Sequence, residues 1–577
     1  MTGKIELPDP QAPRSHSQWR RWLMGFVFVA MCFHLLNFCL GPCTPKNPTV
    51  GSVERGDLDL GKCENLDDPY VCGQLVAPLD YANLSDPRNA SIAVAVFPAG
   101  GGTTPQSEIL GSILLNPGGP GGSGLDFIAR RSPVRNNRTL GEALDTQLKG
   151  KYNIVSFDPR GVGHTWPKVS CFADDLENLY YSSFTVANGL PGHNGARTMK
   201  HEIGTTIARE QLLSNMCQKS EDSELLKYVG TALVVQDMQL IHRALGDDKL
   251  HYWGFSYGTV LGSTYADMFP EDVGRVIIDG VVDVPNYYQG KWSDNFKDIE
   301  AEFDGFFSEC VKSGPEACKL AELAESGPAL KDLVLDWGTR LKHHPIPLAD
   351  ANPPQIYSYF MFISGLFQSM YAPVTWPTIA DGLYEAIKNG NLSSMASGPG
   401  QVRGVEIMQI ACGDNLADFT ENLWGIKDYE RHISELRADS PHFAEFFGQI
   451  GLMCDGIWPV RASERHHGNF TSQTNFPLLV LGNDYDPVTP GRYAKKMAGL
   501  FPNAVHVQRE GYGHCSSSQP SKCIDDIVAA YFLDGELPAP ETVCEVDKPV
   551  FGVSAESSRT SFSSLLDEAV REANYIL

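Results

Sequence analysis

The sequence predicts a doubly wound α/β fold, in which a mostly parallel sheet has helices on both faces and carries a helical cap insertion. Short apolar runs that end in turn residues alternate with segments of helical spacing along the first half of the chain. Such alternation forms right-handed crossovers, which make the strands parallel. The runs that predict strands are 91–99, 112–119, 152–163, 250–256 and 273–282, and the helices are 231–246 and 259–270.

The pattern changes between about 290 and 470, where aromatic-rich helical pieces such as 295–311 and 359–371 replace the strands. Buried strand patterns return at 475–483 and 504–510. A sheet interrupted by an insertion explains this order better than two unrelated domains. We therefore expect one core in two halves, formed by residues 57–289 and 471–545. A helical cap at 290–470 separates the halves, and a tail helix at 546–577 follows them.

The N-terminal region contains one long apolar segment. Residues 22–40 are interrupted only by His34 and Asn37, and Arg20 and Arg21 stand immediately before them. The length matches a membrane-spanning helix better than a secretory signal, and the basic flank should stay cytosolic. We expect a cytosolic tail at 1–21, a signal anchor at 22–41 and a stalk at 42–56. This arrangement makes the chain a single-pass type II membrane protein. Cleavage after Gly41, which would release a secreted protein, is the alternative.

Either topology places the body of the chain in the lumen or outside the cell, and two counts agree with this. Five N-x-S/T glycosylation sequons follow the apolar segment. Of 14 cysteines, 12 lie beyond that segment and could form disulfides, with close pairs at Cys63/Cys72, Cys310/Cys318 and Cys515/Cys523. No cysteine spacing resembles a zinc site, so we expect neither a metal nor a cofactor. The sequon asparagines are Asn83, Asn89, Asn137, Asn391 and Asn469.

The net charge is −24 and the isoelectric point is near 5.0. Such a surface repels phosphate backbones, which argues against nucleic-acid partners. It favours cationic or amine-bearing substrates, although many secreted proteins are acidic for solubility alone. The composition does not indicate an oligomeric state, and the only expected membrane contact is the N-terminal segment.

Ser256 is the candidate nucleophile. It stands in Gly254-Phe255-Ser256-Tyr257-Gly258, after an apolar strand and before a helix, which is the context of a nucleophile elbow. Flanking glycines allow such a tight turn, and the dipole of the following helix favours developing negative charge. A serine that only caps the helix is the alternative.

A serine nucleophile needs a base and an orienting acid, and in this fold they follow it in the order acid, histidine. Asp484 and Asp486 follow a buried strand, and His514 lies in a glycine-bracketed loop 28 residues past Asp486. We choose Asp486 because the rigid Pro487 is beside it, whereas Asp484 could be a turn former. Of the other histidines, His343, His344, His466 and His467 are expected to be solvated, and His251 to be a packing residue.

An oxyanion hole requires two further donors. One is expected from the backbone N–H of Tyr257, the residue after the nucleophile. The second is expected from the loop 116–122, whose sequence is NPGGPGG and which follows an early strand. No G-K-[ST] follows this loop, so it does not resemble a phosphate-binding loop.

Five motifs together resemble the α/β-hydrolase serine peptidases of the prolyl iminopeptidase and tripeptidyl aminopeptidase group, and most closely the secreted tripeptidyl aminopeptidase-like enzymes. They are NPGGPGGSG, FDPRGVG, HYWGFSYG, LGNDYDPVTP and GYGHC, and the resemblance covers roughly residues 60–545. It implies the α/β-hydrolase fold, a triad of Ser256, Asp486 and His514, and oxyanion donors at Gly118 and Tyr257, with Gly119 close by. The helical insertion would restrict access to unblocked peptide N-termini.

These observations predict a serine exopeptidase that releases tripeptides or single residues. An esterase or amidase acting on a small lipid or secondary metabolite with the same triad is the alternative, and a catalytically inactive recognition domain is a third hypothesis. An aminopeptidase also needs a carboxylate for the substrate ammonium, for which Asp414 is the candidate and Glu406 lies nearby. Either acid could equally be a surface acid or a helix cap.

Overall fold

The computed structural model describes residues 54–552 except 133–134, 136, 192–198, 353, 396–404, 418–423 and 447–452. Arg55–Leu577 forms one compact unit, which contains every element below. The expected signal anchor and the expected C-terminal tail helix lie outside the described residues. Within the described ranges, no helix is both long and apolar enough to cross a bilayer.

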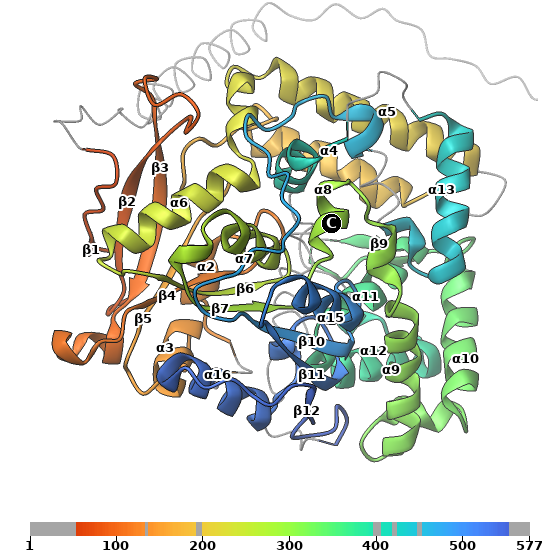
Figure 1. Ribbon diagram of the computed structural model, residues 1–577. Coiled ribbons are helices and arrows are strands. Elements are labelled where there is room, and N and C mark those ends of the chain that lie inside the picture. Colours follow the sequence, from red (N-terminus) through yellow and green to blue (C-terminus); the bar gives the residue numbers. More distant parts are fainter. Residues whose placement is uncertain are drawn as a thin grey trace, which may run out of the picture. The chain divides into compact units, whose positions relative to one another are not determined.

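A ten-stranded sheet runs through this unit in the order β1-β2-β3-β5-β4-β6-β7-β10-β11-β12. Strands β1, β2 and β3 pair antiparallel, β3 pairs antiparallel with β5, and the remaining neighbours are parallel. Figure 1 shows the antiparallel strands at one edge of the sheet and β10 to β12 toward the other. The strands are β1 Gly61–Lys62, β2 Val71–Pro78, β3 Asn89–Phe97, β4 Ser112–Asn116, β5 Asn153–Phe157, β6 Leu250–Phe255, β7 Val273–Asp279, β10 Leu479–Tyr485, β11 Val505–Tyr512 and β12 Thr542–Cys544.

The central strands are apolar on both faces, so each face needs a helical layer. In β4, Leu114 joins one core, whereas Ile113 and Leu115 join the other, because successive side chains of a strand point to opposite faces. Helices α6 Thr231–Ala244, α7 Gly258–Met268 and α15 Gly491–Leu500 pack on the first face. Helices α2 Gly124–Ala129, α3 Leu140–Gln147 and α16 Lys522–Asp534 pack on the second.

A third core, rich in aromatic side chains, lies among the helices of the insertion. Phe306, Trp376 and Phe443 are wholly or almost wholly buried in it. The pair β8 Ile346–Leu348 and β9 Gln355–Tyr357 forms a separate small sheet. The helices of the insertion are α9 Ile299–Ser313, α10 Gly327–Arg340, α11 Tyr359–Tyr371, α12 Trp376–Asn389 and α13 Ile426–Asp439. The short helix α8 Val284–Tyr288 precedes the insertion and packs on the first face of the sheet.

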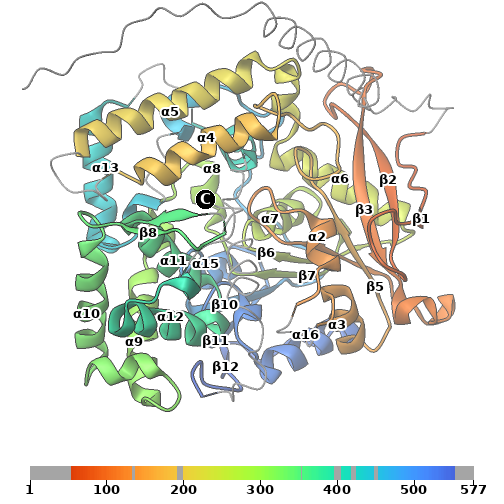
Figure 2. The same cartoon turned by 180° about the vertical axis from the view of Figure 1, so that it is seen from behind.

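Two helices that the sequence did not predict join this layer. They are α4 Asp175–Asn188 and α5 Met199–Lys219, which lie between β5 and α6 in the chain. Figures 1 and 2 both show α5 beside α13, and the side chain of Ser214 donates to the carbonyl of Ile457 at 2.9 Å. The helical layer over the sheet therefore includes a second segment, before the 290–470 insertion.

The described residues form five disulfides, which are typical of a secreted or extracellular protein. The predicted local pairs Cys63–Cys72 and Cys310–Cys318 are confirmed. The predicted pair Cys515/Cys523 is wrong, because Cys523 at the start of α16 forms a disulfide with Cys544 in β12. The thiol of Cys515 instead lies 3.5 Å from the carbonyl oxygen of Asp279, at the end of β7. The remaining bonds are Cys171–Cys217 and Cys412–Cys454.

The sequon asparagines differ in accessibility. Asn83, Asn137, Asn391 and Asn469 are exposed. Asn89 begins β3, is half-buried, and its Oδ1 accepts a hydrogen bond from Arg55 Nε at 2.8 Å. Four of the five positions therefore present the side chain to solvent.

Candidate active site

Ser256 lies in a sharp turn between β6 and α7. Its φ is +53°, a left-handed conformation that a non-glycine residue rarely adopts, and its N–H donates to the carbonyl of Asp279 at 3.0 Å. The glycines around it permit this turn: a Cβ on Gly254 would lie 2.4 Å from the carbonyl oxygen of Gly258. The serine is thus held in a strained backbone at the N-terminus of α7, as the sequence predicts.

Asp486 and His514 meet at the carboxyl end of β10. The Nδ1 atom of His514 is 3.0 Å from both carboxylate oxygens of Asp486, which is fully buried. The backbone N–H groups of Thr489 and Cys515 also donate to this carboxylate, at 2.8 and 2.9 Å. A proton on Nδ1 fits this arrangement and leaves Nε2 as the basic nitrogen.

The pKa of Asp486 lies below its ordinary value. Burial alone would raise it, but the charge of His514 and the hydrogen bonds from His514, Cys515 and Thr489 outweigh that effect. The carboxylate therefore stays ionised near neutral pH and favours a positive charge on the imidazole. Asp484, the other candidate, is half-buried and accepts a hydrogen bond from Gln508 instead.

Asp279, at the end of β7, connects the turn that carries Ser256 (the serine turn) with the loop that carries His514 (the histidine loop). Its backbone carbonyl accepts from Ser256, and its carboxylate accepts from the N–H and hydroxyl of Ser516, at 2.8 and 2.5 Å. Trp253 Nε1 donates to the same carboxylate at 3.3 Å. Burial raises the pKa of Asp279 to about 6, although the hydrogen bonds from Ser516 and Trp253 act to lower it. The sequence did not predict a role for this residue, although an aspartate at the end of an apolar strand is a visible signal.

The glycine-rich loop after β4 lies against the serine turn. A Cβ on Gly118 would be 2.8 Å from Ser256 Cβ and 2.9 Å from the backbone nitrogen of Tyr257. The N–H of Gly118 itself donates to Asn116 Oδ1 at 2.9 Å. Gly119 lines the same pocket as Ser256 and Tyr257. Of the two predicted glycines, Gly119 therefore has the N–H that is better placed for an oxyanion.

A narrow pocket opens beside Ser256, and its walls are mostly apolar or aromatic. Trp292 and Asn295 contribute polar groups to it, and the indole N–H of Trp292 has no hydrogen-bond partner among the described residues. Asn295 is almost fully buried. The other wall residues are Gly119, Tyr257, Val282, Tyr287, Ile407, Val488 and Thr489.

The two candidate amine ligands occupy different positions. Asp414 is fully buried, and its carboxylate accepts from the N–H and hydroxyl of Thr231 and from the hydroxyl of Tyr287. Thr231 also contacts the hydroxyl of Tyr257 at 2.6 Å. These contacts indicate that Asp414 stabilises the pocket wall and does not itself contact a substrate amine.

Glu406 lies closer to the pocket mouth. It is half-buried, precedes the wall residue Ile407, and a Cβ on Gly121 would be 2.8 Å from its Cβ. Burial raises the pKa of its carboxyl. Glu406 is therefore next to the glycine-rich loop.

The remaining histidines lie away from this site, with one unexpected contact. His343, His344 and His467 are exposed, as predicted. His466 is not solvated as predicted: it is half-buried, and its Nε2 lies 2.8 Å from Asp267 Oδ2. The acid that holds His466 is on α7, too far along the chain for the local sequence to reveal it.

Two family models match the chain. The α/β hydrolase fold model matches residues 111–317, and the TAP-like protein model matches residues 440–544. The first match contains the serine turn and the glycine-rich loop. The second contains Asp486 and His514.

Similar proteins cover most of the chain. Serine protease Hip1 of Mycobacterium tuberculosis is 28% identical over 520 residues, which is 87% of this chain and 90% of that protein. The tripeptidyl aminopeptidase of Streptomyces lividans is 28% identical over 501 residues, 85% of this chain and 87% of its own length. Carboxylesterase B of Mycobacterium tuberculosis is 26% identical over 493 residues, 82% of this chain and 86% of its own length.

Proposed function

Because this chain is an α/β hydrolase of the serine peptidase group that includes the tripeptidyl aminopeptidases, we propose that it releases tripeptides or single residues from free peptide N-termini. The observation that carries the proposal is the buried Asp486–His514 pair, whose loop is joined through Ser516 and Asp279 to the strained strand-to-helix turn that carries Ser256. This arrangement supports acyl transfer through a covalent intermediate.

In the proposed mechanism, Ser256 Oγ attacks the scissile carbonyl carbon while His514 Nε2 takes the serine proton. Asp486 keeps the other imidazole nitrogen protonated and stabilises the imidazolium. The C–N bond then breaks, and His514 returns the proton to the leaving amine. Water, activated by the same imidazole, hydrolyses the acyl-enzyme and restores Ser256.

The oxyanion of the tetrahedral intermediate would be held by two backbone donors. One donor is the N–H of Tyr257, which follows the nucleophile and stands immediately before α7. The other is the N–H of Gly119, which belongs to the glycine-rich loop and lines the same pocket. Fixed donors of this kind act where charge develops in the transition state. Gly118 provides the space, because a side chain there would collide with the serine turn.

The helical cap, 290–470 with α4 and α5, is proposed to restrict the site to chain ends, and Glu406 is proposed to bind the substrate ammonium. Replacing Glu406 with Gln should raise KM for a free peptide about tenfold or more and leave the KM of simple acyl esters unchanged. Asp414→Asn is the comparison, since its acid does not line the pocket. Equal effects of Glu406→Gln on both substrates would contradict this role.

The decisive experiment compares peptide reporters that have free or N-acetylated termini. The wild-type protein should cleave the free tripeptidyl reporter and fail on the acetylated one. Ser256→Ala should lower kcat by roughly 10⁴–10⁶-fold with an unchanged melting temperature. An unchanged rate in this variant would remove the serine from the mechanism.

An esterase that acts on a small molecule is the second candidate, and two observations favour it. One relative is named Carboxylesterase B, and the pocket beside Ser256 is mostly apolar. Adding short acyl esters to this series separates the two functions, because an esterase would cleave the esters and none of the peptide reporters.

The cellular location is proposed from the sequence and the disulfides together. We propose a type II membrane protein anchored by residues 22–41, with the catalytic unit outside the cytosol and N-glycans at the exposed sequon asparagines. N-terminal sequencing of the mature protein distinguishes the anchor from a cleaved signal. A mass decrease after glycosidase treatment tests the glycans.

A further inference from the structure

A cleft of about 480 Å³ opens at the amino-terminal edge of the sheet, opposite the edge that carries Ser256. The first residues of β4, β5, β6 and β7 line it, together with the loop that precedes β6. His251 lies in β6 and lines the cleft, and Ser256 follows the last residue of β6. The five residue steps between them span roughly 16 Å at about 3.3 Å per residue. The volume lies in the range of small-molecule sites, and the cleft is separate from the candidate active site.

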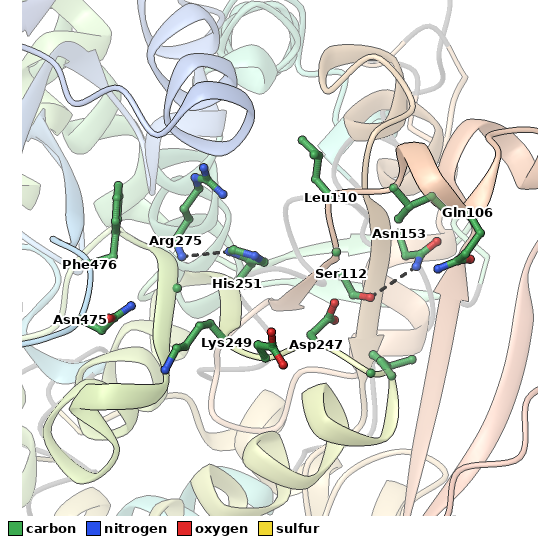
Figure 3. Close-up of a pocket in the computed structure, with 16 residues that line it drawn as sticks. Gln106, Leu110, Ser112, Asn153, Asp247, Lys249, His251, Arg275, Asn475 and Phe476 are labelled. Carbon is green, nitrogen blue, oxygen red and sulfur yellow. Dashed lines mark hydrogen bonds between the residues drawn. The ribbon is translucent and has the colours of Figure 1, made fainter.

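Charged groups of both signs line the cleft. Figure 3 shows Asp247 and Lys249 on the loop before β6, with Arg275 across from them on β7. Asp248 adds a second acid, so the four charges balance. A purely anionic ligand would meet the two carboxylates, and a purely cationic one would meet the lysine and arginine. A ligand that carries one charge of each sign fits both walls.

Two of these groups have unsatisfied hydrogen-bonding capacity. Asp247 Oδ2 and Arg275 Nε are buried, and neither has a hydrogen-bond partner among the described residues. Burial raises the pKa of Asp247 to about 6, so its carboxyl is mostly ionised at pH 7. An unpaired charged group beside a cleft is destabilising, and a ligand group of opposite charge in the cleft reduces that cost.

His251 supplies a neutral donor between these two groups. Its Nδ1 accepts the backbone N–H of Arg275 at 3.0 Å, so the ring proton is on Nε2. Burial lowers the pKa of His251 to about 4, which keeps the ring uncharged near neutral pH. A Cβ on Gly111 would lie 3.0 Å from Asp247 Oδ1 and 3.5 Å from His251 Nε2. The missing side chain at Gly111 therefore leaves room beside both atoms.

The aromatic wall completes the cleft. The guanidinium carbon of Arg275 lies 5.8 Å from the ring centroid of Phe476, and Arg275 Nη1 donates to the hydroxyl of Tyr152 at 3.2 Å. These contacts hold the guanidinium in place beside an apolar surface. A held guanidinium is suited to a carboxylate.

We propose that this cleft is a binding site for a small zwitterion, a free amino acid or short peptide, whose ammonium pairs with Asp247 and whose carboxylate pairs with Arg275. His251 Nε2–H donates a further hydrogen bond to the ligand, and Phe476 contacts its apolar part. The site is separate from the chemistry at Ser256 and does not depend on the proposed peptidase activity.

The test uses the full chain with Ser256→Ala, so that no peptide is consumed. Calorimetric titration with trialanine, N-acetyl-trialanine and trialanine amide measures affinity, and amide hydrogen exchange locates the ligand. Trialanine should bind and protect residues 110–112 and 245–251, and blocking either end should weaken binding at least tenfold. Protection confined to residues 256–258 and 287–295, or equal affinity for the blocked peptides, would overturn the proposal.

Asp247→Asn tests the named contact, because it keeps the side-chain shape and removes the charge. This variant should bind trialanine at least tenfold more weakly and no longer distinguish it from the N-acetylated peptide. Asp526→Asn, an exposed acid on α16 that pairs with Lys522, is the matched control and should bind like the parent. Undiminished binding by a folded Asp247→Asn variant would exclude the proposed ammonium contact. If this variant does not fold, the peptide series on the Ser256→Ala protein decides the question.

Discussion

Asp486 is the single residue on which the proposed chemistry depends most directly. Asparagine at this position would keep the shape but present an amide to His514 Nδ1, so the favoured imidazole tautomer would change. We expect Asp486→Asn to lower kcat by about 10⁴-fold with a small change in KM. Steady-state kinetics on a tripeptidyl reporter measures this.

The matched control is Asp484→Asn, two residues earlier in the chain, near the end of β10. Its carboxyl is bonded to Gln508 and does not contact the histidine loop, so the rate should change less than about threefold. If the two variants lose activity equally, the assignment of the acid is wrong.

Asp279 is a positioning residue in this proposal, since it contacts both loops and no reacting atom. Asp279→Asn weakens the contacts with Ser516, and we expect kcat to fall roughly tenfold to 100-fold while KM changes less than about threefold. Ser516→Ala should reproduce much of this loss, and adding it to Asp279→Asn should have little further effect. Asp272→Asn, at the opposite end of β7, is the control. Fully additive losses would show that the two residues act separately.

The turn between β6 and α7 depends on a glycine that is needed for space. An alanine Cβ at Gly254 would lie 2.4 Å from the carbonyl oxygen of Gly258 and 2.5 Å from the ring of Tyr252, both of which are buried. We expect Gly254→Ala to lower the melting temperature by several degrees and to abolish activity, because the turn must open.

Gly499→Ala is the control for this element-level effect. Gly499 is exposed within α15, and a Cβ there would meet nothing within 4 Å. Alanine is the better helix former by roughly 0.8–1.0 kcal/mol, so this variant should be unchanged or slightly more stable. A melting temperature for Gly254→Ala equal to that of Gly499→Ala would contradict the steric argument.

The elements that the sequence predicts are those whose neighbours in the chain determine their burial. Strands β3 to β7 and β10 are mostly apolar runs, β11 begins with the alternating apolar positions Val505 and Val507, and α6, α9 and α11 have clear helical spacing. The sequence did not predict β2, which contains Gly73 and Gln74, or α5, whose apolar positions are scattered. Strand β2 is stabilised by pairing with β3, the next strand along the chain, whereas α5 contacts the distant insertion, as in the hydrogen bond from Ser214 to Ile457.

The same reasoning explains which parts of the site were predictable. Ser256, Asp486 and His514 each lie in a recognisable local motif. Asp279 does not, because its contact with Ser516 joins residues 237 positions apart. The cysteine pairing failed for a similar reason: Cys515 is close to Cys523 in the chain, but its thiol points toward the end of β7.

Over the whole molecule, the sheet separates two edges that differ in chemistry. The carboxyl-terminal edge carries the serine turn and the histidine loop under the helical cap, and the amino-terminal edge carries the charged cleft. Buried carboxyls occur near both edges, and the pKa values of Asp247, Asp279 and Asp414 are each raised to about 6. The stability of the folded protein should therefore depend on pH in a way that can be assigned to named residues.

Asp414 gives the clearest test because it is fully buried and is not proposed to contact the substrate. Its folded pKa of about 6 exceeds the ordinary value of 3.8 for an aspartate, so the folded state binds more protons than the unfolded state between those values. Its contribution is therefore fully present below about pH 4 and is lost as the pH rises through 6. The difference between pH 4 and pH 7 is roughly 2 kcal/mol. Asp486 has the opposite sign, because its lowered pKa stabilises the fold above about pH 4.

Comparing wild type with Asp414→Asn isolates the first contribution, since the Asp486 contribution is common to both proteins. We expect the wild-type melting temperature, relative to the variant, to rise by a few degrees as the pH falls from 7 to 4. Calorimetry at half-unit pH intervals measures the two curves. Parallel curves over this range would show that Asp414 ionises in the folded protein as it does in the unfolded chain, and would contradict the assigned direction of its shift.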